Sequence, residues 1–168
     1  FNNFRKINND VIDVWSSILK KINNSKLILK ASDVAAVSKI SKEFEKKGVL
    51  NMVKFQPHTK NLNDHLNQYN NIDLALDTFP YNGVTTSCEA TWMGVPVLTM
   101  KGYNFNSRCG ESINKNLNIE YLIAKNENEY VTKALDLSNN PNKYLDLRKE
   151  IFEKALKSPL FDGKNYSK

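Results

Sequence analysis

Short apolar runs alternate with amphipathic helical patterns along the whole of this 168-residue chain. Apolar runs bounded by turn-forming residues are typical of buried strands, and the segments between them repeat apolar residues at helical spacing. The expected strands are 27–29, 53–55, 72–76, 95–100 and 121–124, and the expected helices are 11–22, 34–44, 62–69, 85–93, 107–114, 127–138 and 141–157. Strands that are apolar throughout and alternate with helices predict an α/β, Rossmann-like parallel sheet with helices on both faces. The length suits a single domain over residues 1–168.

The last two helices have apolar faces that we expect to point into the core. The inward positions predicted for them are Tyr130, Val131, Ala134 and Leu135 in the first, and Leu145, Ile151, Phe152 and Ala155 in the second. Ser158 and Pro159 then end the last helix, because the residue before a proline disfavours the helical conformation.

The segment from Asp73 to Met100 points to a phosphate-bearing ligand. It reads as a strand, a turn rich in Pro, Asn and Gly that ends at Gly83, a short helix and a second strand. The helix opens with Thr85 and Thr86, and a helix N-terminus offers free N–H groups and a positive dipole end to an anion. Because parallel sheets bind ligands at the carboxyl ends of their strands, this turn is a candidate diphosphate site. Glu89, one turn further on, could accept hydrogen bonds from a ribose diol.

The same residues also fit a structural explanation that needs no ligand. Residues 86–89 match a capping box, in which Thr86 caps the helix and Glu89 reaches back to the N–H of the cap residue. No glycine-rich fingerprint accompanies them. The residues by themselves leave both readings open.

Composition narrows the class of protein and its partners. The net charge of +6 comes from lysines spread among many Asn and Ile residues, which indicates compositional bias, so no nucleic-acid partner is expected. No run approaches a membrane span and no signal peptide is visible, so we expect a cytoplasmic protein that does not bind membranes. Cys88 and Cys109 lack metal-type spacing, which favours reduced thiols and no metal cofactor. The chain lacks an initiator Met, which favours a fragment of a longer protein.

Several motifs resemble one enzyme family in the same order along nearly the whole chain. DTFPYNGVTTSCEATWMGVPVLTMKG resembles the donor-binding segment of the O-GlcNAc transferase and SPINDLY family, glycosyltransferase family 41. FNNFRKI, NSRCGES, EYLIAKNENEY and KSPLFDGKNY are similar to further landmarks of that family. The resemblance implies the C-terminal lobe of a GT-B glycosyltransferase, which has two Rossmann-like lobes and usually follows tetratricopeptide repeats. It also implies inverting transfer of a sugar from a nucleotide sugar to Ser or Thr of proteins.

The resemblance assigns roles to individual residues. It implies that Asn3, Lys6, Thr85 and Thr86, together with Gly83 in the turn, lie at the donor diphosphate. Glu89 matches an acidic residue at the ribose, and His65 matches a histidine beside the base, with Lys60 as a less secure neighbour. The family's catalytic base and acceptor site belong to other regions, so this fragment should hold no catalytic residue and be inactive by itself.

Each assignment has a simpler alternative that the sequence leaves open. Lys6 would by default be a solvated lysine, and His65 could be a hydrogen-bonded structural histidine. Arg108 is expected to pair with Glu111 at helical spacing, and His58 is a possible wall of the nucleotide pocket.

Departures from the family pattern leave the donor open. Val84 stands where O-GlcNAc transferases often carry a histidine, and PYNG followed by TTSCE is closer to the SPINDLY type, some members of which transfer fucose from GDP-fucose. UDP-GlcNAc is the first choice and GDP-fucose the second. The remaining alternatives are another GT-B transferase with a glycan or small-molecule acceptor, and a non-catalytic interaction domain of the same fold.

Overall fold

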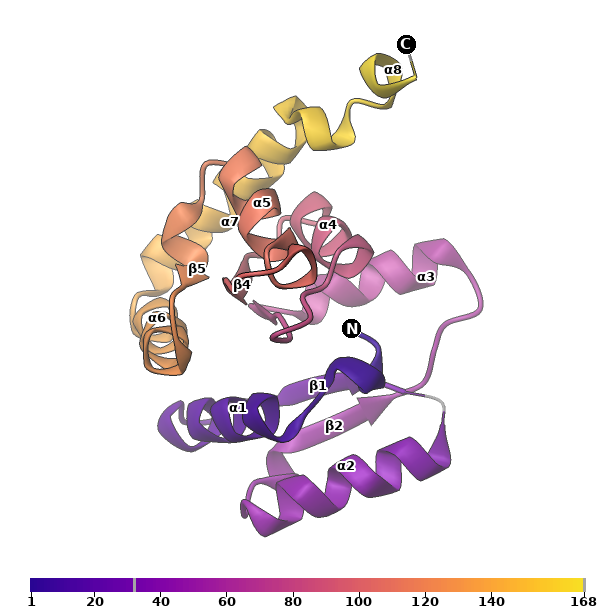
Figure 1. The fold of residues 1–168 in the computed structure, drawn as a ribbon, viewed down its shortest axis with the longest axis vertical. Helices are drawn as coiled ribbons and strands as arrows, with labels where there is room; N and C mark the ends of the chain where they lie inside the picture. Colours follow the sequence, from indigo (N-terminus) through magenta and orange to yellow (C-terminus); the bar gives the residue numbers. More distant parts are fainter. Residues whose placement is uncertain (32, 168) are drawn as a thin grey trace.

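The computed structural model describes residues 1–31 and 33–167, and two groups of parallel strands form its centre (Figure 1). In the first group β1 (Leu27–Lys30) pairs with β2 (Val53–Gln56). In the second, β4 (Val97–Met100) lies between β3 (Ala75–Leu76) and β5 (Ile123–Ala124). Every pairing is parallel, as predicted, but no ladder joins β1 to β3, so the expected sheet is in two parts.

Eight α-helices surround these strands in the described residues. They are α1 (Asn9–Lys21), α2 (Val34–Lys46), α3 (Leu62–Asn67), α4 (Thr85–Trp92), α5 (Cys109–Asn116), α6 (Glu127–Asn139), α7 (Pro141–Lys157) and α8 (Gly163–Tyr166). Short 3-10 turns occupy 4–6, 50–52, 68–71, 105–107, 120–122 and 159–161. Within this part of the chain, no helix has the length and hydropathy needed to cross a membrane.

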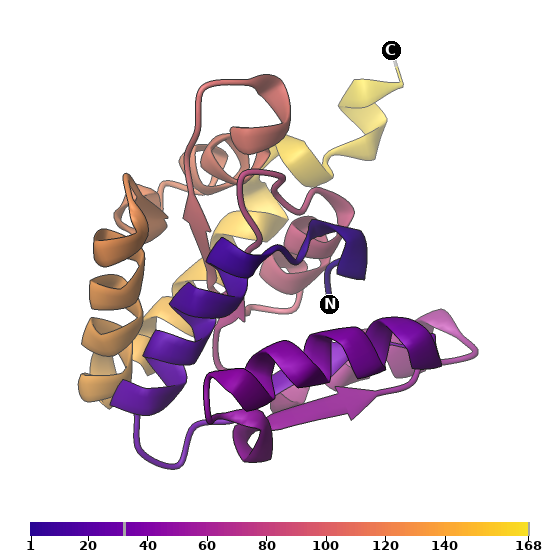
Figure 2. The ribbon, with the colours of Figure 1, turned by 60° about the horizontal axis from the view of Figure 1, so that its bottom comes forward.

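Helices cover both faces of the second strand group, as the apolar strands predicted. In β4, Leu98 packs into a core with α1 and α6, which lie side by side (Figure 2). Its neighbour Val97 packs on the opposite face with Ala90 of α4. Successive side chains of a strand point to opposite faces, so β4 is buried on both sides.

The helix boundaries follow local chemistry. Asn8, Asp33, Asn61 and Asn126 each accept a backbone N–H of the helix that follows, which satisfies donors that the first turn leaves free. After α2, Gly48 adopts a positive φ of 71°, a conformation that glycine reaches without steric cost.

Some expected elements differ in length or orientation. The strands expected at 72–76 and 121–124 are shorter: β3 holds only residues 75–76, and the 3-10 turn at 120–122 takes the first two residues of the other strand. In α7 the buried stripe is Leu147, Ile151 and Ala155, at a spacing of four, whereas Leu145 and Phe152 are exposed, so their predicted inward orientation was wrong. The long helix contacts the rest of the molecule along a narrower face than its apolar pattern suggested.

Candidate functional site

The N-terminus of α4 carries no side-chain cap. The helix begins at Thr85 and its N-cap is Val84, and within residues 1–31 and 33–167 no side-chain cap hydrogen bond is formed there. The alternative of a capping box over residues 86–89 is therefore wrong: the N-cap is Val84, and the carboxylate of Glu89 contacts His65 and Tyr69 instead. Thr85 is exposed and Thr86 half-buried, so the uncapped N–H groups and two hydroxyls lie at the positive end of the helix dipole.

Lys6 lies at the turn that leads into α4, although 76 residues separate it from its partner there. Its Nζ donates to the carbonyl oxygen of Asn82 at 2.8 Å and lies 4.4 Å from the centre of the Tyr81 ring. Partial burial lowers the pKa of Lys6, an effect that the nearby Asp77 opposes. The structure thus brings the predicted cation to the predicted turn.

Asn3 precedes Lys6 and has a local role. Its Oδ1 accepts the N–H of Arg5 at 2.9 Å and caps the 3-10 turn over Phe4–Lys6. Asn3 is exposed on the same segment as Lys6, so the turn that it caps holds Lys6 in place. Its predicted contact with phosphate stays a prediction.

Asp77 organises the turn, a role that could not be recognised from the sequence. Its carboxylate is fully buried, and its Oδ1 accepts the N–H of Gly83 at 2.7 Å and of Thr78 at 2.9 Å. The Nδ2 of Asn2 donates to the same oxygen at 3.2 Å, and the Oγ1 of Thr99 donates to Oδ2 at 2.8 Å. One carboxylate therefore ties together the N-terminal segment, the turn and β4.

Gly83 is a close-packing position rather than an open approach to a ligand. A Cβ on it would come within 2.7 Å of Ser87 Oγ, 2.8 Å of Asn2 Oδ1 and 3.1 Å of Asp77 Oδ1. Its N–H is already bonded to Asp77, so this group is not among the donors that a phosphate could use. Gly83 would therefore act on phosphate binding only indirectly, by setting the backbone path of the turn that leads to Thr85.

His65 and Glu89, the predicted base and ribose contacts, lie in one polar cluster. Glu89 Oε2 contacts His65 Nε2 at 2.9 Å and accepts the Tyr69 hydroxyl at 3.1 Å. On the other side of the ring, Lys30 Nζ contacts His65 Nδ1. Since a lysine ammonium only donates, Nδ1 must accept, and Nε2 then carries the proton that points to Glu89. The neighbours thus fix both the tautomer and the plane of the His65 ring.

Like Tyr69, Lys30 is a member of this cluster that sequence reasoning missed. It is buried at the end of β1, its Nζ also donates to Thr59 Oγ1 at 3.3 Å, and burial lowers its pKa. Its position in the sequence could have indicated a place in the site. Lys30 directly follows the apolar run of Leu27 to Leu29, at the carboxyl end of a strand, where parallel sheets bind ligands.

The other residues singled out from the sequence lie elsewhere or have structural partners. Arg108 pairs with Glu111 at 2.9 Å, as expected, and Lys115 pairs with the same carboxylate. His58 and Lys60 are exposed beyond β2, and their roles stay predictions. Both cysteines are free thiols. Among the described residues, no group of three or more His, Cys, Asp or Glu side chains could hold a metal ion.

Asp77 predicts a specific pH dependence of stability. Burial raises its pKa from 3.8 to about 6, against the hydrogen bonds from Gly83, Thr99, Asn2 and Thr78. Between those values the folded chain holds a proton that the unfolded chain has released, so the stabilising contribution of Asp77 falls as the pH rises through this window.

We expect the free energy of unfolding, measured by urea titration, to fall relative to that of Asp77→Asn by up to about 3 kcal/mol between pH 4 and pH 7. The Asn variant does not titrate and is the control for all other groups. Parallel profiles of the two proteins would contradict the prediction.

Comparison with known proteins shows the relatives of this fold and site. The model of glycosyl transferase family 41 matches residues 1–168. A probable UDP-N-acetylglucosamine--peptide N-acetylglucosaminyltransferase SPINDLY of Hordeum vulgare is 37% identical over 100% of this chain and 18% of its own length. Its counterpart in Arabidopsis thaliana is 32% identical over 99% of the chain and 19% of its own length. The chain thus spans less than a fifth of these curated relatives.

A solved structure agrees with the sequence comparisons. An O-GlcNAc transferase mutant of Thermobaculum terrenum superposes with a TM-score of 0.92 at 31% identity, over 99% of this chain and 33% of that one. The predicted α/β fold of a GT-B lobe is thereby confirmed. The family match over the whole chain and the likeness of the fold agree, and the chain belongs to glycosyltransferase family 41.

Proposed function

We propose that this chain is the nucleotide-sugar-binding lobe of a protein O-glycosyltransferase. The observation that carries the proposal is the uncapped N-terminus of α4 together with the ammonium of Lys6, which donates to Asn82 in the turn just before that helix. Family membership supports it. The alternative of a non-catalytic domain of the same fold gains no support from α4, whose threonines do not cap it, and nucleotide binding separates that alternative from a donor site.

The reaction would be an inverting transfer of a sugar from its nucleotide to a Ser or Thr hydroxyl of a protein. As the bond to the sugar breaks, the leaving nucleoside diphosphate gains negative charge. Donors that are already oriented toward this charge stabilise it most where it develops. Lys6 and the first-turn N–H groups of α4 are such donors, and Thr85 and Thr86 add hydroxyls.

The polar cluster would take the nucleoside. Glu89 uses Oε2 for both His65 and Tyr69, which leaves Oε1 to accept from a ribose hydroxyl. The fixed ring of His65 offers a planar face to a base. Asn3 would lie near the phosphates, in line with its place on the Lys6 segment.

UDP-GlcNAc is the proposed donor, with GDP-fucose as the second choice. The curated relatives carry names of N-acetylglucosaminyltransferases, which favours the first. Val84, 49% exposed, stands where O-GlcNAc transferases often carry a histidine, so the chain lacks that polar group. This difference is the reason that GDP-fucose is retained as the second choice. We further propose that the acceptor protein and the catalytic base are served by other regions of a longer cytoplasmic protein, so that this chain alone is inactive.

Nucleotide titration tests the donor site. We expect UDP or GDP to bind, and Lys6→Ala to raise the dissociation constant at least ten-fold, because a charge-assisted contact to a diphosphate contributes about 1.4 kcal/mol or more. Isothermal calorimetry measures both. Arg5→Ala is the matched control, since Arg5 is an exposed cation of the same turn and should leave the constant unchanged. A folded protein indifferent to both nucleotides at millimolar concentration would refute the donor site.

A further inference from the structure

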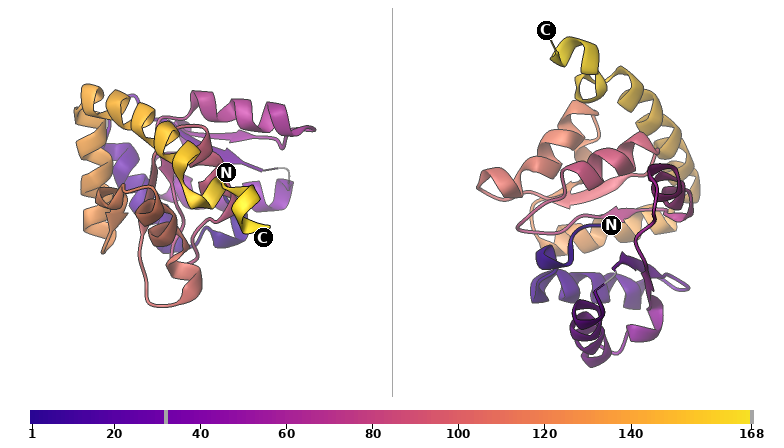
Figure 3. Two further views of the ribbon diagram at one scale, coloured as in Figure 1. Left: turned by 90° about the horizontal axis from the view of Figure 1, so that it is seen from above. Right: turned by 90° about the vertical axis from the view of Figure 1, so that its right-hand side faces the viewer.

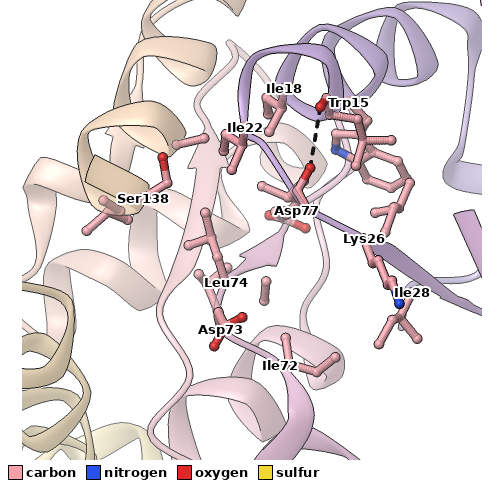
Figure 4. Close-up of a pocket in the computed structure, with 18 of the residues that line it drawn as sticks. Trp15, Ile18, Ile22, Lys26, Ile28, Ile72, Asp73, Leu74, Asp77 and Ser138 are labelled. Carbon is pink, nitrogen blue, oxygen red and sulfur yellow. Dashed lines mark hydrogen bonds between the residues drawn. The ribbon is translucent and has the colours of Figure 1, made fainter. Parts of the chain in front are cut away.

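The two strand groups face each other across a cavity. Its volume is about 710 Å³, and Ile28 of β1 and Leu74, just before β3, line it from the two groups (Figure 4). Within residues 1–31 and 33–167 no ladder joins β1 to β3, so sheet hydrogen bonds do not fix how the two groups lie relative to each other. Where residues of both groups meet at the candidate site, their relative position depends on packing and on side-chain contacts.

A chain of polar contacts links the two groups at the candidate site. Lys30, the last residue of β1, contacts Nδ1 of His65, and Nε2 of His65 contacts Glu89 Oε2 at 2.9 Å. Glu89 belongs to α4, which packs against β4 of the second group. Phe1 lies between the two groups as well, and its ring is 5.1 Å from Lys30 Nζ (Figure 3). The lysine of one group is therefore connected to the carboxylate of the other through a single imidazole ring.

The ammonium group of Lys30 is fully used by contacts within the protein. An ammonium has three N–H groups and no acceptor. Its contacts are with His65 Nδ1, with Thr59 Oγ1 at 3.3 Å, and with the ring of Phe1, which is close enough for a cation–π interaction. The Lys30 side chain is also buried, so it is not placed to meet a ligand itself. Any effect of Lys30 on a ligand is therefore transmitted by its neighbours, and His65 is the neighbour that contacts Glu89.

Lys30 fixes how His65 meets Glu89. Contacts at both ring nitrogens hold the imidazole in one plane, and the ammonium at Nδ1 keeps the ring proton on Nε2, where it is donated to Glu89. If the ammonium is removed, the ring is held at one nitrogen only and is no longer restricted to this tautomer. In the other tautomer the lone pair of Nε2 faces the carboxylate, and two acceptors repel each other. Glu89 would then keep the Tyr69 hydrogen bond but turn away from His65.

We propose that Lys30 is a positioning residue, which holds Glu89 for the ribose of a bound nucleotide through His65. The inference rests on the proposed function and deepens it, because it adds a residue that touches neither ribose, base nor phosphate. While His65 and Tyr69 both hold Oε2, Oε1 of Glu89 is left in a fixed direction to accept from a ribose hydroxyl. A carboxylate that turns away from His65 can take several directions, and ordering it on binding costs affinity.

Isothermal calorimetry with UDP and GDP tests the inference through Lys30→Met. Methionine is also a long, unbranched side chain but donates no hydrogen bond, so we expect the dissociation constant to rise about ten-fold, the value of one hydrogen bond to a charged group. In a Glu89→Ala background the same substitution should change the constant less than about two-fold, because residues that act through one another are not additive. Lys54→Met is the matched control, since Lys54 is an exposed lysine on β2 beside β1 and should leave the constant unchanged.

Nitrogen NMR of the His65 ring supplies a readout that a loss of packing would not change. The chain has two histidines, and His65→Gln identifies the signals of this one. We expect a proton on Nε2 alone in the unsubstituted chain and a mixture of tautomers in Lys30→Met. Lys30→Arg is the second variant, and it guards against a methionine variant that fails to fold. Because a guanidinium also only donates, this variant should keep the tautomer and most of the affinity.

An equal rise on Lys30→Met with and without Glu89, or no rise at all, would overturn the inference and leave the donor site intact. A single unchanged tautomer in Lys30→Met would overturn it too. If the unsubstituted chain binds neither UDP nor GDP, the proposed function fails, and the inference that rests on it fails with it. Nucleotide binding by the unsubstituted chain therefore tells the two failures apart.

Discussion

Asp77→Ala is expected to lower the free energy of unfolding by about 3–5 kcal/mol at neutral pH. The substitution removes the acceptor of the Gly83 and Thr78 N–H groups and of the Thr99 hydroxyl in a fully buried position. Each buried donor left without a partner costs about 1–3 kcal/mol. The costs of donors that share one acceptor are not fully additive. Urea denaturation followed by circular dichroism measures the change.

Asp77→Asn is the control for this loss. Its amide oxygen can still accept from Gly83, and the Thr99 hydroxyl can rotate to accept from the new NH₂ group. We therefore expect Asp77→Asn to lower the free energy of unfolding by only about 1 kcal/mol. Since the bond to Gly83 fixes the turn before Thr85, the Ala variant should also bind UDP or GDP more weakly, while Asn should retain binding. An Ala variant as stable as the Asn variant would show that the carboxylate does not hold the turn.

The elements that local patterns specify could be predicted from the sequence. The apolar spacing that predicts a helix over 11–22 buries Val11, Val14, Trp15, Ile18 and Leu19 and leaves Ile22, at the C-cap, half-buried. Parallel pairing follows from strands that are apolar throughout. These features depend on residues within one or two turns of each other. The same applies to the pairing of Arg108 with Glu111.

The parts of the site that could not be predicted depend on partners distant in sequence. In the sequence nothing distinguishes Asp77 from the other acidic residues. Only the fold brings its partners Asn2, Gly83 and Thr99 around it. Glu89 has the spacing of a capping residue, but the ring of His65 and the hydroxyl of Tyr69 hold its carboxylate on another side. A capping motif is a local preference, and two tertiary hydrogen bonds outweigh it here.

Gly110→Ala tests a conflict between local and tertiary effects. Gly110 is buried in the first turn of α5, where alanine would favour the helix by about 1 kcal/mol. A Cβ there would overlap Thr99 Oγ1, lie 2.7 Å from Thr99 Cβ and 2.8 Å from Asp77 Oδ2. Thr99 cannot give way easily, because it is β-branched, fully buried on β4 and bonded to Asp77.

We therefore expect Gly110→Ala to destabilise the protein by about 3 kcal/mol, since overpacking a rigid site costs more than the helix gains. Thermal and urea unfolding measure the loss. Gly163→Ala, at the start of α8 with nothing within 4 Å of its Cβ, is the matched control and should be neutral or slightly stabilising. If Gly110→Ala instead stabilised the protein as Gly163→Ala should, α5 could move away from β4, and the tight contact around Asp77 would not constrain the turn before α4.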